Sequence, residues 1–346
     1  MKLSINTARS RFAIPAGLLL CLLILGGGSW AQEDTTAATE QVTEEPELPA
    51  KPKPVKNTFQ SVWIIDNQTV MVPVKGTLEM DIMHRFGTVN KGYKDFWGFF
   101  APSNIRLGLS YSPINKLNLG FGITKSNMLW DASAKYSIIT QTPKQYPVSV
   151  TYYGNVAYDT RNDADKSIFR YSTQRVSFFN QLIIARKIND KLSVQVAPSH
   201  SHQNAVDGFY TKNDSTGQET FKNMKHDHFA VSFAARYKLT NVTSLIFNFD
   251  QPLTKHATNN PNPNLAFGVE FNTSSHSFQL FFGNYFYLNQ QRNNLYNTNS
   301  PFAYDDPTKT HPERQTDNPD TPKDESVRVK GGRFLIGFNI TRLWNY

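Results

Sequence analysis

Apart from Leu335, the C-terminal stretch of the sequence alternates between apolar residues and polar or small ones. The apolar positions are Phe334, Ile336, Phe338 and Ile340. A period of two places these side chains on one face of a β-strand and the intervening residues on the other. The sequence then ends on Trp344-Asn345-Tyr346. An amphipathic last strand that ends on aromatic residues is typical of a β-barrel that closes in an outer membrane.

The same alternation recurs along most of the chain. We expect about twelve strands, at residues 77–86, 105–111, 117–124, 130–138, 148–158, 175–186, 192–202, 229–237, 243–250, 265–272, 277–288 and 328–344. Short connections, such as 113–116 and 238–241, alternate with long ones, such as 87–103 and 289–326. The connection at 125–128 is an exception, because it is short where the alternation predicts a long one. Membrane barrels have short periplasmic turns, long external loops and an even number of strands.

These patterns predict an all-β protein, an antiparallel transmembrane β-barrel with both termini in the periplasm. A soluble β-sandwich or jelly roll is the rival fold, because its strands also alternate. Two observations favour the membrane barrel. In nearly every strand the large apolar residues occupy every second position and so lie on one face. The connections also alternate between short and long along the chain, which a soluble sheet does not require.

The region before the barrel divides into three parts. Residues 1–31 are expected to be a signal peptide, with a basic start, an apolar stretch and Ser29-Trp30-Ala31 as the cleavage site. Residues 32–57 are expected to be a disordered periplasmic linker, acidic and then rich in proline and lysine. Residues 58–76 are expected to form a short periplasmic hairpin, because two apolar runs flank Asp66-Asn67-Gln68. The barrel itself spans 77–346.

Composition limits the chemistry of the chain. The single cysteine, Cys21, lies in the expected signal peptide, so the mature chain has no disulfide and no thiolate site. The formal net charge is +8, but the basic residues are scattered among acids, which argues against nucleic-acid binding. The expected partners are outer-membrane lipid, the barrel assembly machinery and an envelope or periplasmic protein reached through the linker. No cofactor is expected.

Several short stretches carry a resemblance to a known family. They are Asn57-Thr58-Phe59, Lys75-Gly76-Thr77-Leu78, His84-Arg85-Phe86-Gly87, Arg106-Leu107-Gly108-Leu109, Ala235-Arg236-Tyr237-Lys238-Leu239 and Gly337-Phe338-Asn339-Ile340-Thr341-Arg342. On these stretches, residues 57–346 resemble a family of β-barrel proteins of Bacteroidetes-type bacteria that is known as a domain of unknown function. The resemblance implies an outer-membrane barrel and transfers no activity.

The polar face of the predicted strands carries both acids and bases. The residues expected to line the lumen are Glu79, Asp81, Arg85, Arg106, Asp131, Lys135, Arg236, Glu270 and Arg333. Two interpretations are open at this point. The charges either pair with one another and fill the barrel, or they line a selective pore, because twelve strands lie between filled eight-stranded barrels and open sixteen-stranded porins.

Four histidines lie near the same loop, and two chemistries could use them. His200 and His202 precede the loop, and His226 and His228 follow it. Two His-x-His pairs can bind a transition metal, although extrapolated parity puts the first pair on the lipid face and the second on the lumen face. The run Ser199 to Asn204 also looks superficially like the Ser-His-Asn set of barrel phospholipases, with a different spacing.

The sequence therefore predicts a non-enzymatic outer-membrane protein of a Gram-negative bacterium, most simply a small pore for polar solutes. A structural barrel with a closed, salt-bridged lumen that binds envelope partners is the alternative, and a barrel hydrolase is the third hypothesis.

Overall fold

The computed structural model describes residues 52–212, 218–256, 260–306, 327–329 and 331–345. The expected signal peptide and residues 32–51 of the expected linker lie outside the described residues. Within the described part, no helix is long and apolar enough to span a membrane.

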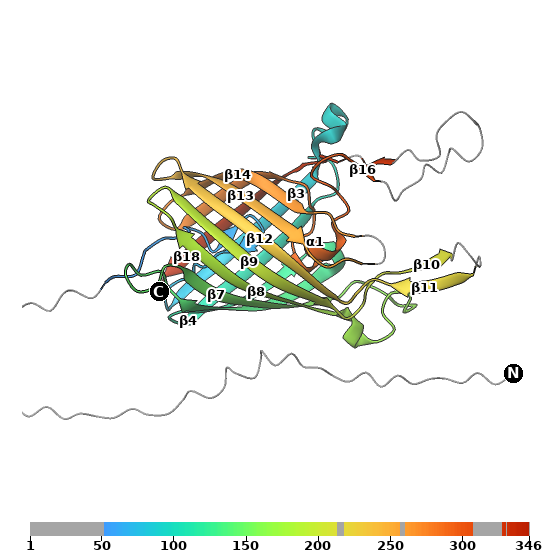
Figure 1. Ribbon diagram of the computed structural model, residues 1–346, viewed down its shortest axis with the longest axis horizontal. Coiled ribbons are helices and arrows are strands. Elements are labelled where there is room, and N and C mark those ends of the chain that lie inside the picture. The colour runs from blue at the N-terminus through green and yellow to red at the C-terminus, as the bar shows by residue number, and fades with distance from the viewer. Residues whose placement is uncertain (1–51, 213–217, 257–259, 307–326, 330, 346) are drawn as a thin grey trace, which may run out of the picture. The chain divides into compact units, whose positions relative to one another are not determined.

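Twelve antiparallel strands form one closed barrel, as predicted (Figure 1). In order around the barrel they are β3 (Thr77–Thr88), β4 (Asn104–Ile114), β5 (Leu117–Thr124), β6 (Leu129–Ile139), β7 (Ser149–Asp159), β8 (Val176–Lys187), β9 (Leu192–Gln203), β12 (Asp227–Lys238), β13 (Thr243–Pro252), β14 (Asn264–Asn272), β15 (His276–Gly283) and β18 (Leu335–Asn345). The last strand, β18, pairs with the first, β3, and closes the ring. We call the end with the short connections the turn end and the opposite end the loop end.

The two faces of the wall follow the alternation read from the sequence. On β4 and β5, Leu107, Leu109 and Phe121 point outward and are 39%, 52% and 47% exposed, while Arg106, which precedes Leu107 on β4, points inward and is 4% exposed. Apolar side chains that remain this exposed in a folded wall are suited to lipid and not to water. The same pattern repeats around the ring, with large apolar residues outside and polar residues inside.

The last two strands are shorter than the sequence predicts. The chain leaves β15 at Gly283 and returns to the sheet only at Leu335, so the expected strand residues 284–288 and 328–334 belong to the connection. This connection contains a short helix, α1 (Gln290–Tyr296), and a strand pair, β16 (Tyr304–Asp306) with β17 (Val327–Val329). A second strand pair, β10 (Gly208–Lys212) with β11 (Glu219–Asn223), extends the connection between β9 and β12.

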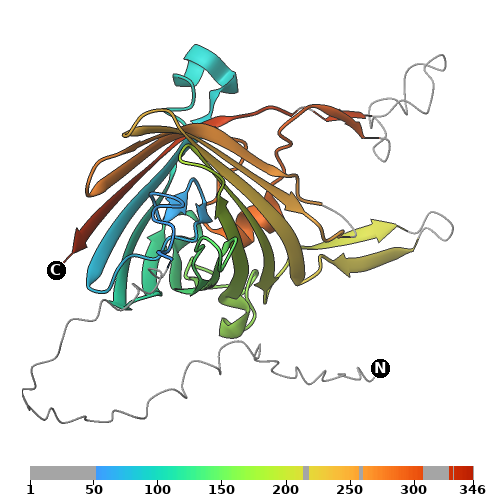
Figure 2. The same cartoon turned by 60° about the vertical axis from the view of Figure 1, so that its left-hand side comes forward.

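The segment before the barrel is the main departure from the expectation. Its hairpin forms, with β1 (Trp63–Ile64) paired to β2 (Asn67–Gln68), but the turn is Ile65-Asp66 and not Asp66-Asn67-Gln68. The hairpin also lies inside the ring of strands, shown in blue in Figure 2, and not in the periplasm outside the barrel. The physical reason is that inward side chains from most of the wall offer hydrogen bonds and apolar surface that the hairpin can bury.

Candidate functional site: the plugged lumen

Residues 58–70, which we call the plug, occupy the middle of the barrel. The chain enters at the turn end, where the Val55 amide donates to the Gln141 carbonyl (2.7 Å), and it leaves at the same end, where the Gly76 amide donates to the Ser112 carbonyl (2.8 Å). Twelve of the thirteen plug residues are buried, and the thirteenth, Gln60, is half-buried. At the tip of the hairpin Ile65 adopts a positive φ of 57° and is fully buried. The plug is therefore a loop inserted into the lumen from the turn end.

Side chains from nine of the twelve strands form hydrogen bonds to the plug. The wall residues are Arg85 on β3, Lys135 on β6, Thr151 on β7, Gln181 on β8, Gln195 on β9, Arg236 on β12, Asn248 on β13, Gln279 on β15 and Asn339 on β18. Several of them bind plug backbone groups, which a hairpin with two short strands leaves unpaired. The wall thus supplies the partners that a wider sheet would otherwise supply.

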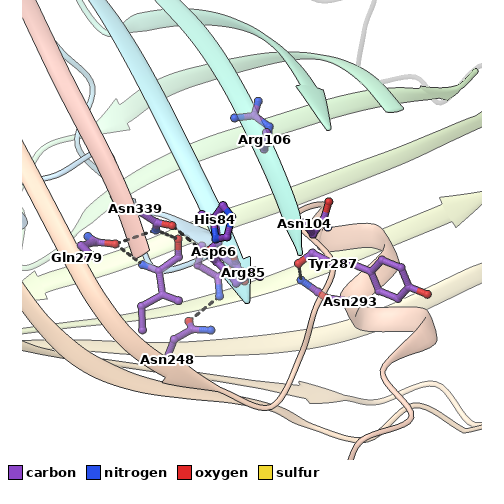
Figure 3. A network of polar contacts seen from close by, with 12 residues as sticks. Asp66, His84, Arg85, Asn104, Arg106, Asn248, Gln279, Tyr287, Asn293 and Asn339 are labelled. Atoms are coloured by element: carbon purple, nitrogen blue, oxygen red, sulfur yellow. Dashed lines mark hydrogen bonds and ion pairs between the residues drawn. The ribbon is translucent and has the colours of Figure 1, made fainter. Parts of the chain in front are cut away.

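The tip of the hairpin is hydrogen-bonded to wall residues of β15 and β18 (Figure 3). Gln279 accepts from the Ile65 amide (3.0 Å) and donates to the Trp63 carbonyl (2.8 Å), and Asn339 donates to the Ile65 carbonyl (2.6 Å). The neighbouring Asp66 forms an ion pair with Arg85, whose side chain is fully buried. This geometry fixes the depth of the plug in the lumen.

Apolar contacts hold the other side of the plug. Phe59, Ile64, Ile65 and Val70 share one buried cluster with inward wall residues. The wall members are Tyr153, Phe179, Ile183, Ala185, Ala197, Ala234, Ile246, Ala266 and Phe281, and Tyr285 joins them from the connection after β15. Small inward alanines on consecutive strands leave the width that the plug fills. The lumen therefore contains a small hydrophobic core next to its polar network.

Two arginines of the wall form ion pairs with wall carboxylates. Arg106 donates to Asp81 (2.6 Å) and through two nitrogens to Asp131 (2.8 and 3.1 Å), and the Trp63 ring of the plug lies 5.5 Å from its guanidinium carbon. Arg236 donates to Glu270 (2.8 Å). A buried guanidinium with carboxylate partners is retained in low dielectric because each charge satisfies the other. The result is a salt-bridged interior.

Eight of the nine residues expected to line the lumen are buried there: Glu79, Asp81, Arg85, Arg106, Asp131, Lys135, Arg236 and Glu270. The exception is Arg333, which the alternation placed on the inward face of the last strand. It precedes β18, its side chain is exposed, and its carbonyl accepts from the Asn299 side chain (2.6 Å). Arg333 lies outside the strand because β18 begins later than the pattern suggests, and Arg333 lines a cavity at the loop end.

A second element closes the lumen from the loop end. The helix α1 turns inward, and its Gln290 donates to the Asp66 carbonyl of the plug (2.8 Å), while Gln291 donates to Asn155 on β7 (3.1 Å). A cavity of about 620 Å³ remains beside α1, β3 and β18 and is rich in aromatic and asparagine side chains, among them Tyr287 and Asn293. The first part of the loop expected at 289–326 thus forms α1 and packs against the plug and β7. Residues 307–326 of this loop lie outside the described part.

The four candidate histidines fall into two separate groups. His200 and His202 lie on the outer side of β9, where both rings contact Asp227 (2.9 and 2.7 Å), and His226 stacks near His202 at 6.1 Å between ring centroids. His228 points inward, and its Nδ1 lies 3.0 Å from Nε2 of His256. Among the described residues, no group of three or more histidine, cysteine or acidic side chains has the geometry to hold a metal ion.

The serines next to these histidines face the other way. Ser199 and Ser201 are buried on the inner side, and the Ser199 hydroxyl donates to the Ala230 carbonyl (3.3 Å). His200 and His202 lie on the opposite side of the same strand, so a Ser-His contact requires a side chain to cross the wall. The run Ser199 to Asn204 therefore lacks the arrangement that a barrel phospholipase needs.

Comparisons with known proteins agree with the architecture. Residues 59–344 match the model of a family described as "Membrane bound beta barrel domain (DUF5777)". A search of curated proteins finds no match. Among solved structures, the chain is similar to an outer-membrane channel from Pseudomonas putida F1, with 11% identity, a TM-score of 0.41 and coverage of 79% of this chain and 97% of that one. It is also similar to the NanC porin, with 9% identity, a TM-score of 0.40 and coverage of 78% and 99%. At these TM-scores the two likenesses carry no functional argument.

Proposed function

Because this chain belongs to the family of membrane-bound β-barrel domains, we propose that it is a non-enzymatic pore for small polar solutes that the plug keeps closed at rest. The family and the closed barrel confirm the outer-membrane location that the sequence predicted. In this proposal the plug, residues 58–70, is the gate, and the turn end faces the periplasm, so that the linker before residue 58 reaches the plug from that side.

The observation that carries the proposal is the chemistry of the wall behind the plug. Around nine strands the wall offers amides, hydroxyls and charges, and these groups bind the plug through hydrogen bonds that water can replace. A wall of this kind is ready to be hydrated once the plug leaves. The plug enters and leaves the barrel at one end, so it can withdraw without breaking the ring of strands.

The balance of lumen charges predicts the selectivity of the open state. Arg85, Arg106, Lys135 and Arg236 face Glu79, Asp81, Asp131 and Glu270 in the same interior. Asp250 on β13 adds a fifth buried acid, which accepts from the plug residue Asn67. With four bases against five acids the mean field along the open lumen is small, and ion selectivity should be weak. Replacing both Arg106 and Arg236 with glutamate should shift permeation toward cations.

A structural barrel with a permanently closed lumen is the second candidate, and the apolar cluster around the plug favours it. Phe59, Ile64 and Val70 are buried against the wall as in an ordinary hydrophobic core. In that case the plug stabilises the barrel, and the linker or the loops meet an envelope partner.

Conductance in planar bilayers separates the two candidates. The test compares the full chain, a variant without residues 58–70 and a matched variant without residues 32–51 only, which keeps the plug. We expect steady conductance from the first deletion, and rare or no openings from the full chain and from the linker deletion. Heat-modifiable gel mobility shows whether each variant has formed its barrel. A folded plug deletion that stays silent at all voltages rejects the pore and leaves the structural barrel.

A further inference from the structure

The connection between β3 and β4, residues 89–103, exposes a group of aromatic side chains that no other part of the fold covers among the described residues. The exposed fractions are 83% for Tyr93, 45% for Phe96, 47% for Trp97, 43% for Phe99 and 82% for Phe100. We call these residues the aromatic loop; its first part is the helical turn η2 (Val89–Asp95). Soluble surfaces rarely expose so many large rings together, so this surface marks an interaction.

The rings of the aromatic loop continue the lipid-facing surface of the wall. Phe99 packs on Phe86, an outward residue of β3, with 4.4 Å between ring centroids, and Phe86 lies 6.0 Å from the outward Phe338 of β18. From Phe99 the contacts pass to Phe96 at 5.8 Å and then to Trp97 at 5.4 Å. The apolar exterior of the barrel therefore extends without a break onto the loop.

The loop stands off the side of the barrel and not over its opening. Both Figure 1 and Figure 2 show the blue-green turn of η2 outside the ring of strands, near the loop end. Its base is fixed by a close approach of two glycines: the Gly87 amide donates to the Gly98 carbonyl (3.0 Å), and a Cβ on Gly98, whose φ is +86°, would lie 2.3 Å from the Gly87 oxygen. Only glycine fits there, and the base therefore aims the rings sideways.

The charges of the loop suit a lipid surface. Lys91 and Lys94 are exposed, whereas Asp95 is half-buried and accepts from the Gly98 amide (3.1 Å). Lysine side chains beside aromatic rings are typical of segments that lie at the boundary of headgroups and acyl chains, where the ammonium meets phosphate and the rings meet hydrocarbon.

We propose that the aromatic loop inserts its rings into the headgroup boundary of the membrane leaflet at the loop end, with Lys91 and Lys94 bound to lipid phosphates. The occupant of this surface is lipid, because the surface is continuous with the lipid-facing wall through Phe99, Phe86 and Phe338. The loop thereby anchors the barrel at a fixed depth in that leaflet. This inference does not depend on whether the lumen conducts.

The hairpin β10–β11 supplies a matched control. Tyr210 is 73% exposed and its ring lies tilted against Phe221, with 5.1 Å between ring centroids, so it is an exposed aromatic residue in another loop at the same end. It lacks the ring contacts that join the aromatic loop to the wall, and in Figure 1 its hairpin extends away from the barrel in the direction of the barrel axis. We therefore expect Tyr210 to meet water where Phe100 meets lipid.

Fluorescence quenching in liposomes tests the proposal. The chain from residue 32 onward has no cysteine, since Cys21 is the single one in the sequence. Phe100→Cys, Leu107→Cys and Tyr210→Cys can therefore each carry one bimane label. In liposomes with lipids brominated near the headgroup, the label at 100 should be quenched as the lipid-facing label at 107 is, and the label at 210 should respond only to iodide in water.

Two further experiments ask whether something other than lipid covers the aromatic loop and whether its rings and lysines hold it at the membrane. Energy transfer between labels at position 100 on separate chains would show that a second copy covers the loop, and it would overturn the proposal. So would a label at 100 that responds to iodide as the one at 210 does. In barrels with unchanged gel mobility, Phe96→Ser with Trp97→Ser should reduce quenching at 100 by the brominated lipid. Lys91→Gln with Lys94→Gln should reduce it more in vesicles that contain phosphatidylglycerol than in phosphatidylcholine alone.

Discussion

Replacing Asp66 with alanine should release the plug without breaking the barrel. Asp66 lies on the plug and its partner Arg85 lies on β3, with side-chain exposures of 6% and 0%. Removing one member of a buried ion pair costs about 3–5 kcal/mol, because the other charge remains buried without its partner. Arg85 can regain water once the plug leaves, so the substitution destabilises the docked state of the plug relative to the undocked state by this amount. A factor of ten corresponds to about 1.4 kcal/mol, so the undocked fraction should rise by roughly two to three and a half powers of ten.

Labelling kinetics measure this shift directly. Ser61 lies in the plug and is 4% exposed, so Ser61→Cys reacts with a membrane-impermeant maleimide only when the plug undocks. The labelling rate of Ser61→Cys should rise by the same factor when Asp66→Ala is added, and planar bilayers should show more frequent openings. Asp190→Ala is the matched control, because Asp190 is fully exposed and lies 3.6 Å from Lys187 in a surface pair worth about 0–1 kcal/mol.

Arg85→Met alone and the double variant Asp66→Ala with Arg85→Met complete a thermodynamic cycle. Methionine fills much of the volume of Arg85 without its charge, so the double variant should dock the plug better than Asp66→Ala alone, although Arg85 also donates to Asn339 (3.0 Å). The reasoning is refuted if Asp66→Ala labels no faster than its Asp190→Ala control while both barrels remain folded. That result would mean that the apolar cluster and the other hydrogen bonds from the wall hold the plug without the ion pair.

Other consequences of the structure can be tested on the same protein. Phe121→Arg should destabilise the barrel by about 2–4 kcal/mol in unfolding titrations, because its side chain faces lipid. Gly122→Ala, on the lumen side, should also destabilise it, since a Cβ there lies 2.2 Å from the Arg106 guanidinium, whereas Gly154→Ala meets nothing closer than 3.2 Å and should be tolerated; equal stability of the two glycine variants would contradict this. Removing residues 343–346 should abolish heat-modifiable mobility, because Leu343, Trp344 and Asn345 pair with β3 to close the ring. Burial and then Lys225 lower the pKa of His256 below its ordinary 6.5. The neutral ring accepts from the Lys225 amide (3.1 Å), so this contribution to stability is present above pH 6.5 and is lost as the pH falls below it. The protection factor of the Lys225 amide in hydrogen exchange, corrected for the intrinsic exchange rate at each pH, should therefore fall in acid, and less so in His256→Gln.

The sequence by itself determined the barrel, because the constraint that creates a membrane barrel is local. Every strand has to present apolar residues to lipid at a period of two, so the sequence of each strand shows which of its side chains face lipid and which face the lumen. This is why Arg106, Asp131 and Arg236 could be placed in the lumen from sequence alone. Alternation does not define where a strand ends: it placed Arg333 on the last strand, whereas the strand begins two residues later, at Leu335.

Tertiary structure alone decided what fills the barrel. The plug carries two short apolar runs and a turn signal, which identify a hairpin but not its surroundings. Its position depends on groups far apart in the sequence, such as Gln279 and Asn339, which meet Ile65 only after the ring has closed. The same holds for the pairing of Arg85 with Asp66 and for the inward turn of α1. Each of these contacts joins segments whose distance is set by closure of the whole sheet, and no periodicity within one segment encodes that distance.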